Sequence, residues 1–319
     1  MDKKEVSASP FKIGFLLIDG FAMMSFSSTT EPLRAANLLA ERKVYDIRHI
    51  PVSGASAVSS SGAVIAANAH VGEQVDFDLV LVFAGGNPFS FTGERVFQWL
   101  RHLSARGVQL GGVSGGPVIL ARAGVMKNRR MTVHWEHARA LAMMLPDLIV
   151  ERSLYVMDRD RLTCAGGIAP LDMMHALISN NHGTDFARQV SDWFMHTWIR
   201  PSGGEQRAGL VERYGITHLP VILTIEAMIN HIADTLSLDQ LAGFAQVSPR
   251  QLNRLFKSKL NQTTMDFYRN LRLEKARNLL SQTPLSSTEI ALATGFSSSA
   301  HFSSAFRAKF NQPPSSCRQ

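Results

Sequence analysis

One turn of the chain, Gly112-Val-Ser-Gly-Gly116, combines residue types that could carry covalent chemistry. Its Gly-x-Ser-x-Gly pattern matches the nucleophile elbow, in which a tight turn between a strand and a helix presents a serine hydroxyl. His134 follows twenty residues after Ser114 and is a candidate base for the hydroxyl proton. An amidase- or hydrolase-like enzyme that uses Ser114 and His134 is therefore one prediction from the sequence.

The same turn also suits binding without catalysis. A serine nucleophile needs an acid that orients its base, and the sequence does not identify one: Glu136 and Asp172 are present, with no spacing that ties either to His134. A glycine-rich turn that opens a helix directs backbone N–H groups and a positive helix end toward a bound anion, and the Ser114 hydroxyl adds a donor. We therefore predict no catalytic residue and a site for a carboxylate.

Residues near this turn complete the predicted pocket. Gly85, Gly86 and Asn87 follow a strand end, where open α/β sheets place their ligands, although simple turn chemistry would also explain the glycines. Trp135, Phe21 and Phe26 are expected at the same sheet edge, where aromatic faces attract cationic nitrogen; the alternative for each ring is core packing. A zwitterion such as a quaternary amine or an amino acid has a carboxylate for the Ser114 turn and a cationic nitrogen for the aromatic rings. The predicted ligand-binding residues are Gly86, Asn87, Ser114, His134 and Trp135.

Alternating strands and helices must position this turn. Apolar runs predict strands at 11–18, 45–52, 77–83 and 108–113, and helical spacing predicts helices at 27–42, 95–105 and 116–123. Further on we expect strands at 131–134, 148–150, 154–157 and 162–164, and helices at 136–144, 170–180 and 184–198. This alternation predicts a doubly wound, flavodoxin-like α/β sheet.

The last hundred residues contain one helix-turn-helix unit twice, at 238–256 and 287–306. Each unit ends in a helix with one apolar stripe, at Leu252, Leu255, Phe256 and Leu260 in the first and at Phe302, Ala305, Phe306 and Phe310 in the second. Ser248 followed by Pro249 predicts a helix start, Ser286-x-x-Glu289 predicts a capping box, and Gly295 suits the sharp turn. Duplicated units of this kind read DNA.

Polar residues off these stripes are the predicted DNA contacts. Arginine can pair with guanine, and asparagine or glutamine with adenine, in the major groove. The first unit supplies Arg250, Gln251, Asn253 and Arg254, and the second supplies Ser298, Ser299, His301 and Ser304. The second set predicts phosphate contacts and weaker base discrimination. A helix over 264–280, about 25 Å long, should join the two units.

Composition agrees with this division. The chain carries a net charge of +7, of which we assign +5 to residues from 221 onward, as phosphate binding requires. Cys164 and Cys317 are the only cysteines, too few for a disulfide framework or a metal site, which suits a reducing cytoplasm. No signal peptide or membrane span is expected. The predicted domains are 11–200 and 220–319, joined by a linker at 201–219.

Both parts resemble known families. The C-terminal hundred residues resemble the DNA-binding domain of AraC-type regulators through the runs 248–256, 268–277 and 289–291 and through Gly295-Phe296. Residues 84–86, 112–117 and 132–135 resemble the DJ-1/PfpI family, which places cysteine where this chain has Ser114. The combination resembles GlxA-type regulators, most of all those of carnitine, glycine betaine and related amine or amino-acid catabolism. AraC-type proteins also often carry a longer or charged side chain where Ser304 stands.

This resemblance implies a cytoplasmic transcriptional regulator of catabolic genes, an activator rather than a repressor. Its DJ-1/PfpI-like domain is expected to sense a small effector and to dimerise, and no cofactor or metal is implied. The expected partners are double-stranded DNA, RNA polymerase, the effector and a second copy of the chain. Two alternatives remain: an enzyme with an appended DNA-binding domain, and a constitutive DNA-binding protein whose α/β domain only oligomerises.

Overall fold

The computed structural model describes residues 9–73, 76–206, 209–283 and 285–317. The chain divides between residues 206 and 207 into two compact units, which we describe separately. The first is an α/β unit and the second is helical. Within the segment expected as a linker, residues 201–206 belong to the first unit, and helix α7 (Leu210–Tyr214) lies in the second.

Apolar strands build a six-stranded sheet in the first unit. Its order is β2-β1-β5-β6-β10-β9. The strands are β1 (Phe11–Leu17), β2 (Tyr45–Pro51), β5 (Leu79–Ala84), β6 (Gln109–Ser114), β9 (Tyr155–Asp158) and β10 (Arg161–Cys164). All neighbours pair in parallel except β9 and β10. The direction of winding reverses between β1 and β5, so the carboxyl ends of these strands flank the switch point of the sheet.

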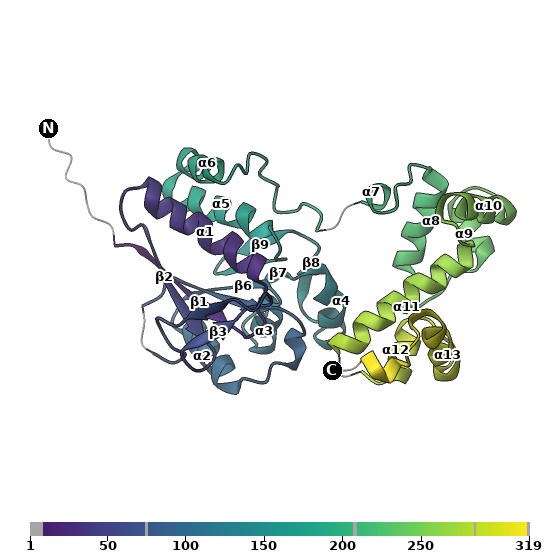
Figure 1. Cartoon of the computed structure of the whole chain (residues 1–319), viewed down its shortest axis with the longest axis horizontal. Helices are drawn as coiled ribbons and strands as arrows, with labels where there is room; N and C mark the ends of the chain where they lie inside the picture. Colours follow the sequence, from purple (N-terminus) through teal and green to yellow (C-terminus); the bar gives the residue numbers. More distant parts are fainter. Residues whose placement is uncertain (1–8, 74–75, 207–208, 284, 318–319) are drawn as a thin grey trace. The chain divides into compact units, whose positions relative to one another are not determined.

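Helices cover both faces of this sheet, as the alternating sequence pattern predicts. Helices α1 (Met23–Leu39), α5 (Ala169–His182) and α6 (Thr184–Trp193) lie on one face, and α2 (Glu94–Ala105) and α3 (Gly116–Arg122) on the other (Figure 1). Around them lie the shorter elements β3 (Ser56–Val58), β4 (Val64–Ala66), η1 (Pro88–Ser90), β7 (Arg130–Thr132), α4 (Trp135–Met144) and β8 (Ile149–Glu151). The doubly wound, flavodoxin-like architecture is confirmed.

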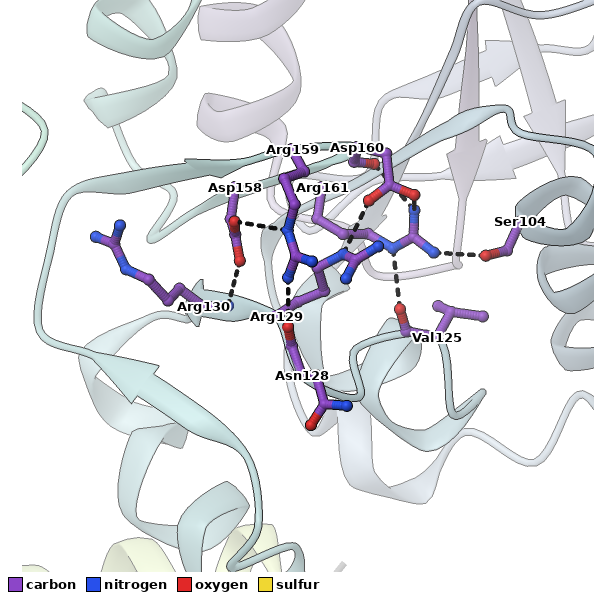
Figure 2. Close-up of polar contacts among 9 residues, drawn as sticks. All are labelled: Ser104, Val125, Asn128, Arg129, Arg130, Asp158, Arg159, Asp160 and Arg161. Atoms are coloured by element: carbon purple, nitrogen blue, oxygen red, sulfur yellow. Dashed lines mark hydrogen bonds and ion pairs between the residues drawn. The ribbon is translucent and has the colours of Figure 1, made fainter.

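A buried arginine fixes the beginning of β10. Arg161 is 4% exposed, and its guanidinium donates to Val125 O at 2.9 Å, to Asp160 Oδ2 at 2.7 Å and to Ser104 Oγ. Arg129 Nε donates to the other carboxylate oxygen of Asp160 at 2.9 Å. Figure 2 shows these groups converging from three separate stretches of chain. They lock the amino end of β10, and Cys164 at its other end pairs with Val113 of β6.

The second unit contains the two expected helix-turn-helix motifs. After α7, its helices are α8 (Leu219–Asn230), α9 (Leu238–Phe244), α10 (Pro249–Leu260), α11 (Thr264–Gln282), α12 (Ser287–Ala293) and α13 (Ser299–Phe310), followed by η2 (Pro314–Cys317). Helix α11 joins the two motifs (Figure 1). Leu252 and Phe256 of α10 and Phe302 and Phe306 of α13 are fully buried, so the predicted apolar stripes form the cores.

The predicted helix boundaries in this unit are confirmed. Ser248 Oγ accepts from Gln251 N at 3.2 Å with Pro249 in the first turn, and Ser286 and Glu289 form a reciprocal capping box. Gly295 has φ +75°, and a Cβ there would lie 2.7 Å from Ile232 O. Only glycine meets both demands of that turn.

Candidate functional site

Ser114 occupies a strained turn at the carboxyl end of β6. Its φ is 61°, in the left-handed region, and its side chain is 8% exposed. The glycines around it allow close backbone packing, because a Cβ at Gly116 would lie 1.9 Å from Val82 O and one at Gly112 would lie 2.5 Å from Pro117 N. A non-glycine residue in this conformation costs about 1–3 kcal/mol, and such residues cluster at functional sites.

Loop backbone surrounds the elbow closely. A Cβ at Gly166 would lie 2.7 Å from Ser114 Cβ, and Gly167 N donates to Ser25 Oγ at 2.9 Å. The N–H of Gly115 donates to Ala84 O at 3.0 Å. This amide is therefore used inside the protein, and the expectation that the glycine-rich turn directs its N–H groups at a ligand is wrong for Gly115. The Ser114 hydroxyl makes no hydrogen bond with another described residue.

His134 and Trp135 lie beside the elbow. His134 N donates to Ser114 O at 3.3 Å, and the His134 and Trp135 ring centroids are 5.1 Å apart, with Trp135 38% exposed. The ring nitrogen Nδ1 of His134 accepts from Glu136 N at 3.4 Å and lies 3.9 Å from Glu136 Oε2.

The candidate acid Asp172 is bonded elsewhere. It is fully buried, and its Oδ1 accepts from His196 Nε2 and Arg200 N, both at 2.9 Å. Its Oδ2 accepts from Arg200 Nε at 2.9 Å and Nη2 at 2.7 Å. Asp172 is therefore bonded to His196 and Arg200, and these bonds do not place it as the acid that orients His134.

The other predicted pocket residues divide into two groups. Gly86 has φ +56°, and a Cβ there would meet nothing within 4 Å, while Asn87 Oδ1 caps η1 by accepting from Phe89 N at 3.2 Å. Both follow β5 at the sheet switch point. Phe21 and Phe26, by contrast, are buried with ring centroids 5.4 Å apart. The expectation that these two rings attract a cationic nitrogen at the sheet edge is wrong, because they pack in the core of the first unit.

The buried thiol of Cys164 is unsuited to nucleophilic chemistry. Burial raises the pKa of the Cys164 thiol to about 12, so it stays protonated at neutral pH. The described residues hold no group of three His, Cys, Asp or Glu side chains arranged for a metal ion. Nor does any helix over these residues have the length and apolar character needed to cross a membrane.

The first recognition helix, α10, presents a basic face. Arg250, Gln251 and Arg254 are exposed. Asn253 is half-buried, and its Oδ1 accepts from Thr264 N at 3.0 Å, at the first residue of α11. The structure therefore uses Asn253 to join α10 to α11, whereas its three predicted companions face solvent.

The second recognition helix, α13, is less charged. Ser298 Oγ caps it by accepting from His301 N at 3.2 Å, Ser299 is half-buried, and Ser304 is exposed. The exposed ring of His301 packs edge-on against Phe296 with centroids 5.6 Å apart. Lys309 bonds to Asn270 O and Glu274 Oε1, each at 3.1 Å.

Comparisons with known proteins identify both units. Residues 11–180 match the DJ-1/PfpI family, and residues 241–319 match a helix-turn-helix domain. The chain is 45% identical over 97% of its length to the HTH-type transcriptional regulator GlxA of Rhizobium meliloti (strain 1021), covering 95% of that protein. The chain belongs to the GlxA-type transcriptional regulators. It is also 40% identical to the HTH-type transcriptional regulator CdhR of Pseudomonas aeruginosa, over 95% of this chain and 90% of that one.

A solved structure of a related protein agrees with the assignment of this chain to the GlxA-type regulators. An AraC family transcriptional regulator from Pseudomonas putida matches with a TM-score of 0.53 and 26% identity, over 58% of this chain and all of that one. As a transcriptional regulator, the protein binds DNA, and its relatives are named as regulators rather than as enzymes.

Sequence patterns missed one residue that ties the joining helix α11 of this GlxA-type regulator to its second motif. Arg272 of α11 donates from Nε to Thr294 O at 2.7 Å, and its guanidinium lies 4.2 Å from the Phe296 ring centroid. Burial lowers the pKa of this guanidinium. The available signal was an arginine on a helix face that also carries Tyr268 and Ala276, both fully buried.

Proposed function

We propose that the first unit binds a small zwitterionic metabolite at the Ser114 elbow, and that this occupancy controls transcription. The observation that supports it most is the strained, left-handed Ser114 at the carboxyl edge of the sheet, one strand from the switch point. Open α/β sheets bind their ligands at this edge. The predicted ligand residues Gly86, Asn87, Ser114, His134 and Trp135 all follow or end strands there, or lie in the β7–α4 turn bonded to Ser114.

The side chains suggest the chemistry of the ligand. The Ser114 hydroxyl is a donor for a carboxylate, and the partly exposed Trp135 ring offers a face for a cationic nitrogen, worth about 0.5–2 kcal/mol. A quaternary amine or an amino acid carries both groups. With Phe21 and Phe26 in the core, the proposed cation site consists of one ring rather than a cage.

The pocket is proposed to bind without catalysis. Serine chemistry needs a base in contact with the hydroxyl and an acid behind the base. Here the His134 Nδ1 atom caps α4 and Asp172 is bonded to Arg200 and His196. A hydrolase that uses Ser114 and His134 is the second candidate, supported by the elbow geometry alone.

We further propose how the second unit reads DNA. Arg250, Gln251 and Arg254 are the proposed base contacts of α10, and Ser298, Ser299, His301 and Ser304 are proposed to contribute phosphate contacts and weaker discrimination. Because Asn253 is bonded to Thr264, base reading by α10 rests on the other three. We propose an activator that acts on RNA polymerase as a cytoplasmic homodimer.

The test is calorimetric titration of the full chain with glycine betaine, carnitine, dimethylglycine and arginine, on the native protein and on Ser114→Ala. We expect one of these zwitterions to bind, at least tenfold more weakly to the variant, while operator binding by the variant is unchanged. Unchanged binding by Ser114→Ala would place the effector elsewhere. Turnover of a ligand that Ser114→Ala abolishes would establish the hydrolase instead.

A further inference from the structure

The last residues of the first unit form a segment, 196–206, that we call the exit strap. Its first half is held by Asp172 of α5, which accepts from His196 and from both the backbone and the guanidinium of Arg200. In its second half, Ser202 O accepts from Leu154 N at 2.8 Å. The strap thus binds α5 at one point and the entry to β9 at another.

Gln206 makes the final attachment. Its Nε2 donates to Ser153 O at 2.7 Å, to Thr132 Oγ1 at 3.0 Å and to Val133 O at 3.1 Å. Thr132 is fully buried, and its hydroxyl in turn donates to Ser153 O at 2.7 Å. One side-chain amide therefore holds together the β7–α4 turn and the segment before β9.

The strap is bonded to two segments that adjoin Ser114, the proposed effector site. Val133, which accepts from Gln206, precedes His134, whose N–H donates to Ser114 O. Asp172 lies in α5, and the turn that leads into α5 places Gly166 against Ser114. A ligand that displaces either segment also displaces an anchor of the strap.

We propose that the exit strap reports occupancy of the Ser114 pocket to the DNA-binding unit, with Gln206 as the positioning residue that couples them. This inference rests on the proposed effector site. The chain enters the second unit directly after Gln206, so a released strap lengthens the tether of the DNA-binding helices and a docked strap shortens it. Coupling of this kind needs an element with two arrangements that the ligand can bias.

Gln206 has a feature suited to two arrangements. Its Oε1 atom is buried and accepts no hydrogen bond from a described group, although three acceptors lie within hydrogen-bond distance of its Nε2 atom, which has two hydrogens to donate. A buried acceptor without a partner opposes docking, because the same oxygen is hydrated when the side chain is released. The docked and released states are therefore closer in free energy than the hydrogen bonds of Nε2 alone imply.

The experiment is hydrogen exchange measured by mass spectrometry on the full chain and on Gln206→Ala, with Glu205→Ala as the matched control. Glu205 is the exposed neighbour of Gln206. Without ligand, Gln206→Ala should speed exchange at least about fivefold in the β7–α4 turn, residues 132–137, as well as in the strap, whereas Glu205→Ala should change neither. A purely local role would affect residues 200–206 alone and would overturn the proposal.

A second arm uses glycine betaine and arginine as probes, with calorimetry on each variant. A probe that binds should change strap exchange in the native chain; in Gln206→Ala this response should be lost while the probe affinity stays within about threefold. A retained response, or equal loss of affinity and response, overturns the coupling role. Failure of both probes to bind counts against the effector site only, since the ligand-free comparison decides the strap by itself.

Discussion

Two adjacent glycines provide a matched test of the elbow pocket. Gly166 has φ +95°, and a Cβ there would meet Ser114 Cβ at 2.7 Å and Ser25 Oγ at 3.0 Å. Gly167 has φ +62°, and a Cβ there would meet nothing within 4 Å. Gly166→Ala and Gly167→Ala therefore both impose a left-handed alanine, but only the first pushes a methyl group against the elbow.

The expected magnitudes differ accordingly. A left-handed alanine costs roughly 1–2 kcal/mol, which is the whole effect expected for Gly167→Ala. Gly166→Ala adds an overpacking cost of roughly 1–3 kcal/mol, because the clash is with the rigid Cα and Cβ of Ser114. At about 2–4 °C per kcal/mol for a unit of this size, Gly167→Ala should lower the melting temperature by about 2–8 °C and Gly166→Ala by several degrees more.

Ligand affinity should distinguish the two variants more clearly than the melting temperature does. Calorimetry with the zwitterion that binds the native chain should show at least tenfold weaker binding to Gly166→Ala, and a change within about threefold for Gly167→Ala. Melting followed by circular dichroism supplies the stability difference on the same samples. Equal affinities for the two variants, with Gly166→Ala folded, would refute the placement of the effector at Ser114.

Three further outcomes are expected in the second unit. Arg254→Ala should weaken cognate operator binding by about 1–3 kcal/mol and leave random DNA unaffected in anisotropy titrations; equal loss on both would indicate a phosphate contact. Asn253→Ala should destabilise the unit by about 0.5–2 kcal/mol in urea unfolding, because Thr264 N loses the oxygen to which it donates. Asn253→Asp keeps an acceptor oxygen and should recover most of this stability. The Ser286 hydrogen bonds lower the pKa of Glu289. The folded pKa lies below the unfolded one, so this capping contribution is present above about pH 4.5 and is lost as the pH falls through the folded pKa; Glu289→Gln should remove that part of the acid sensitivity in melts.

Local sequence signals predicted much of the fold because their causes are local. The capping box at Ser286 and the glycine turn at Gly295 act within four residues, and both are confirmed. Helix α1 begins at Met23, four residues before the predicted start. Its N-cap, Ala22, makes no side-chain capping bond, so the sequence carries no start signal there. The short β3–β4 hairpin was not predicted, because three-residue strands show little periodicity.

Partners distant in sequence could not be predicted in this way. Asp172 meets Arg200 across two helices, and Asn253 meets Thr264 across a turn, so the role of each depends on packing rather than on spacing. An aromatic side chain near a sheet edge has the same sequence pattern around it whether it faces a ligand or the core. Trp135 is partly exposed and Phe21 is fully buried, and the sequence does not distinguish them.

The attachments of α11 have a consequence for the sites that this regulator can use. Asn253 fastens α10 to the first residue of this nineteen-residue helix, and Arg272 and Arg277 fasten the second motif farther along it, through contacts with Phe296 and Phe310. Helix α11 is about 28 Å long, and because both motifs are attached to it, it holds the recognition helices α10 and α13 at a fixed separation. One base pair inserted between the two DNA segments that these helices contact would rotate one segment by about 34–36° relative to the other. Two recognition helices held at a fixed separation cannot adjust to this rotation. Its genomic targets should therefore share a constant phase between two short blocks, even where the bases between them vary freely.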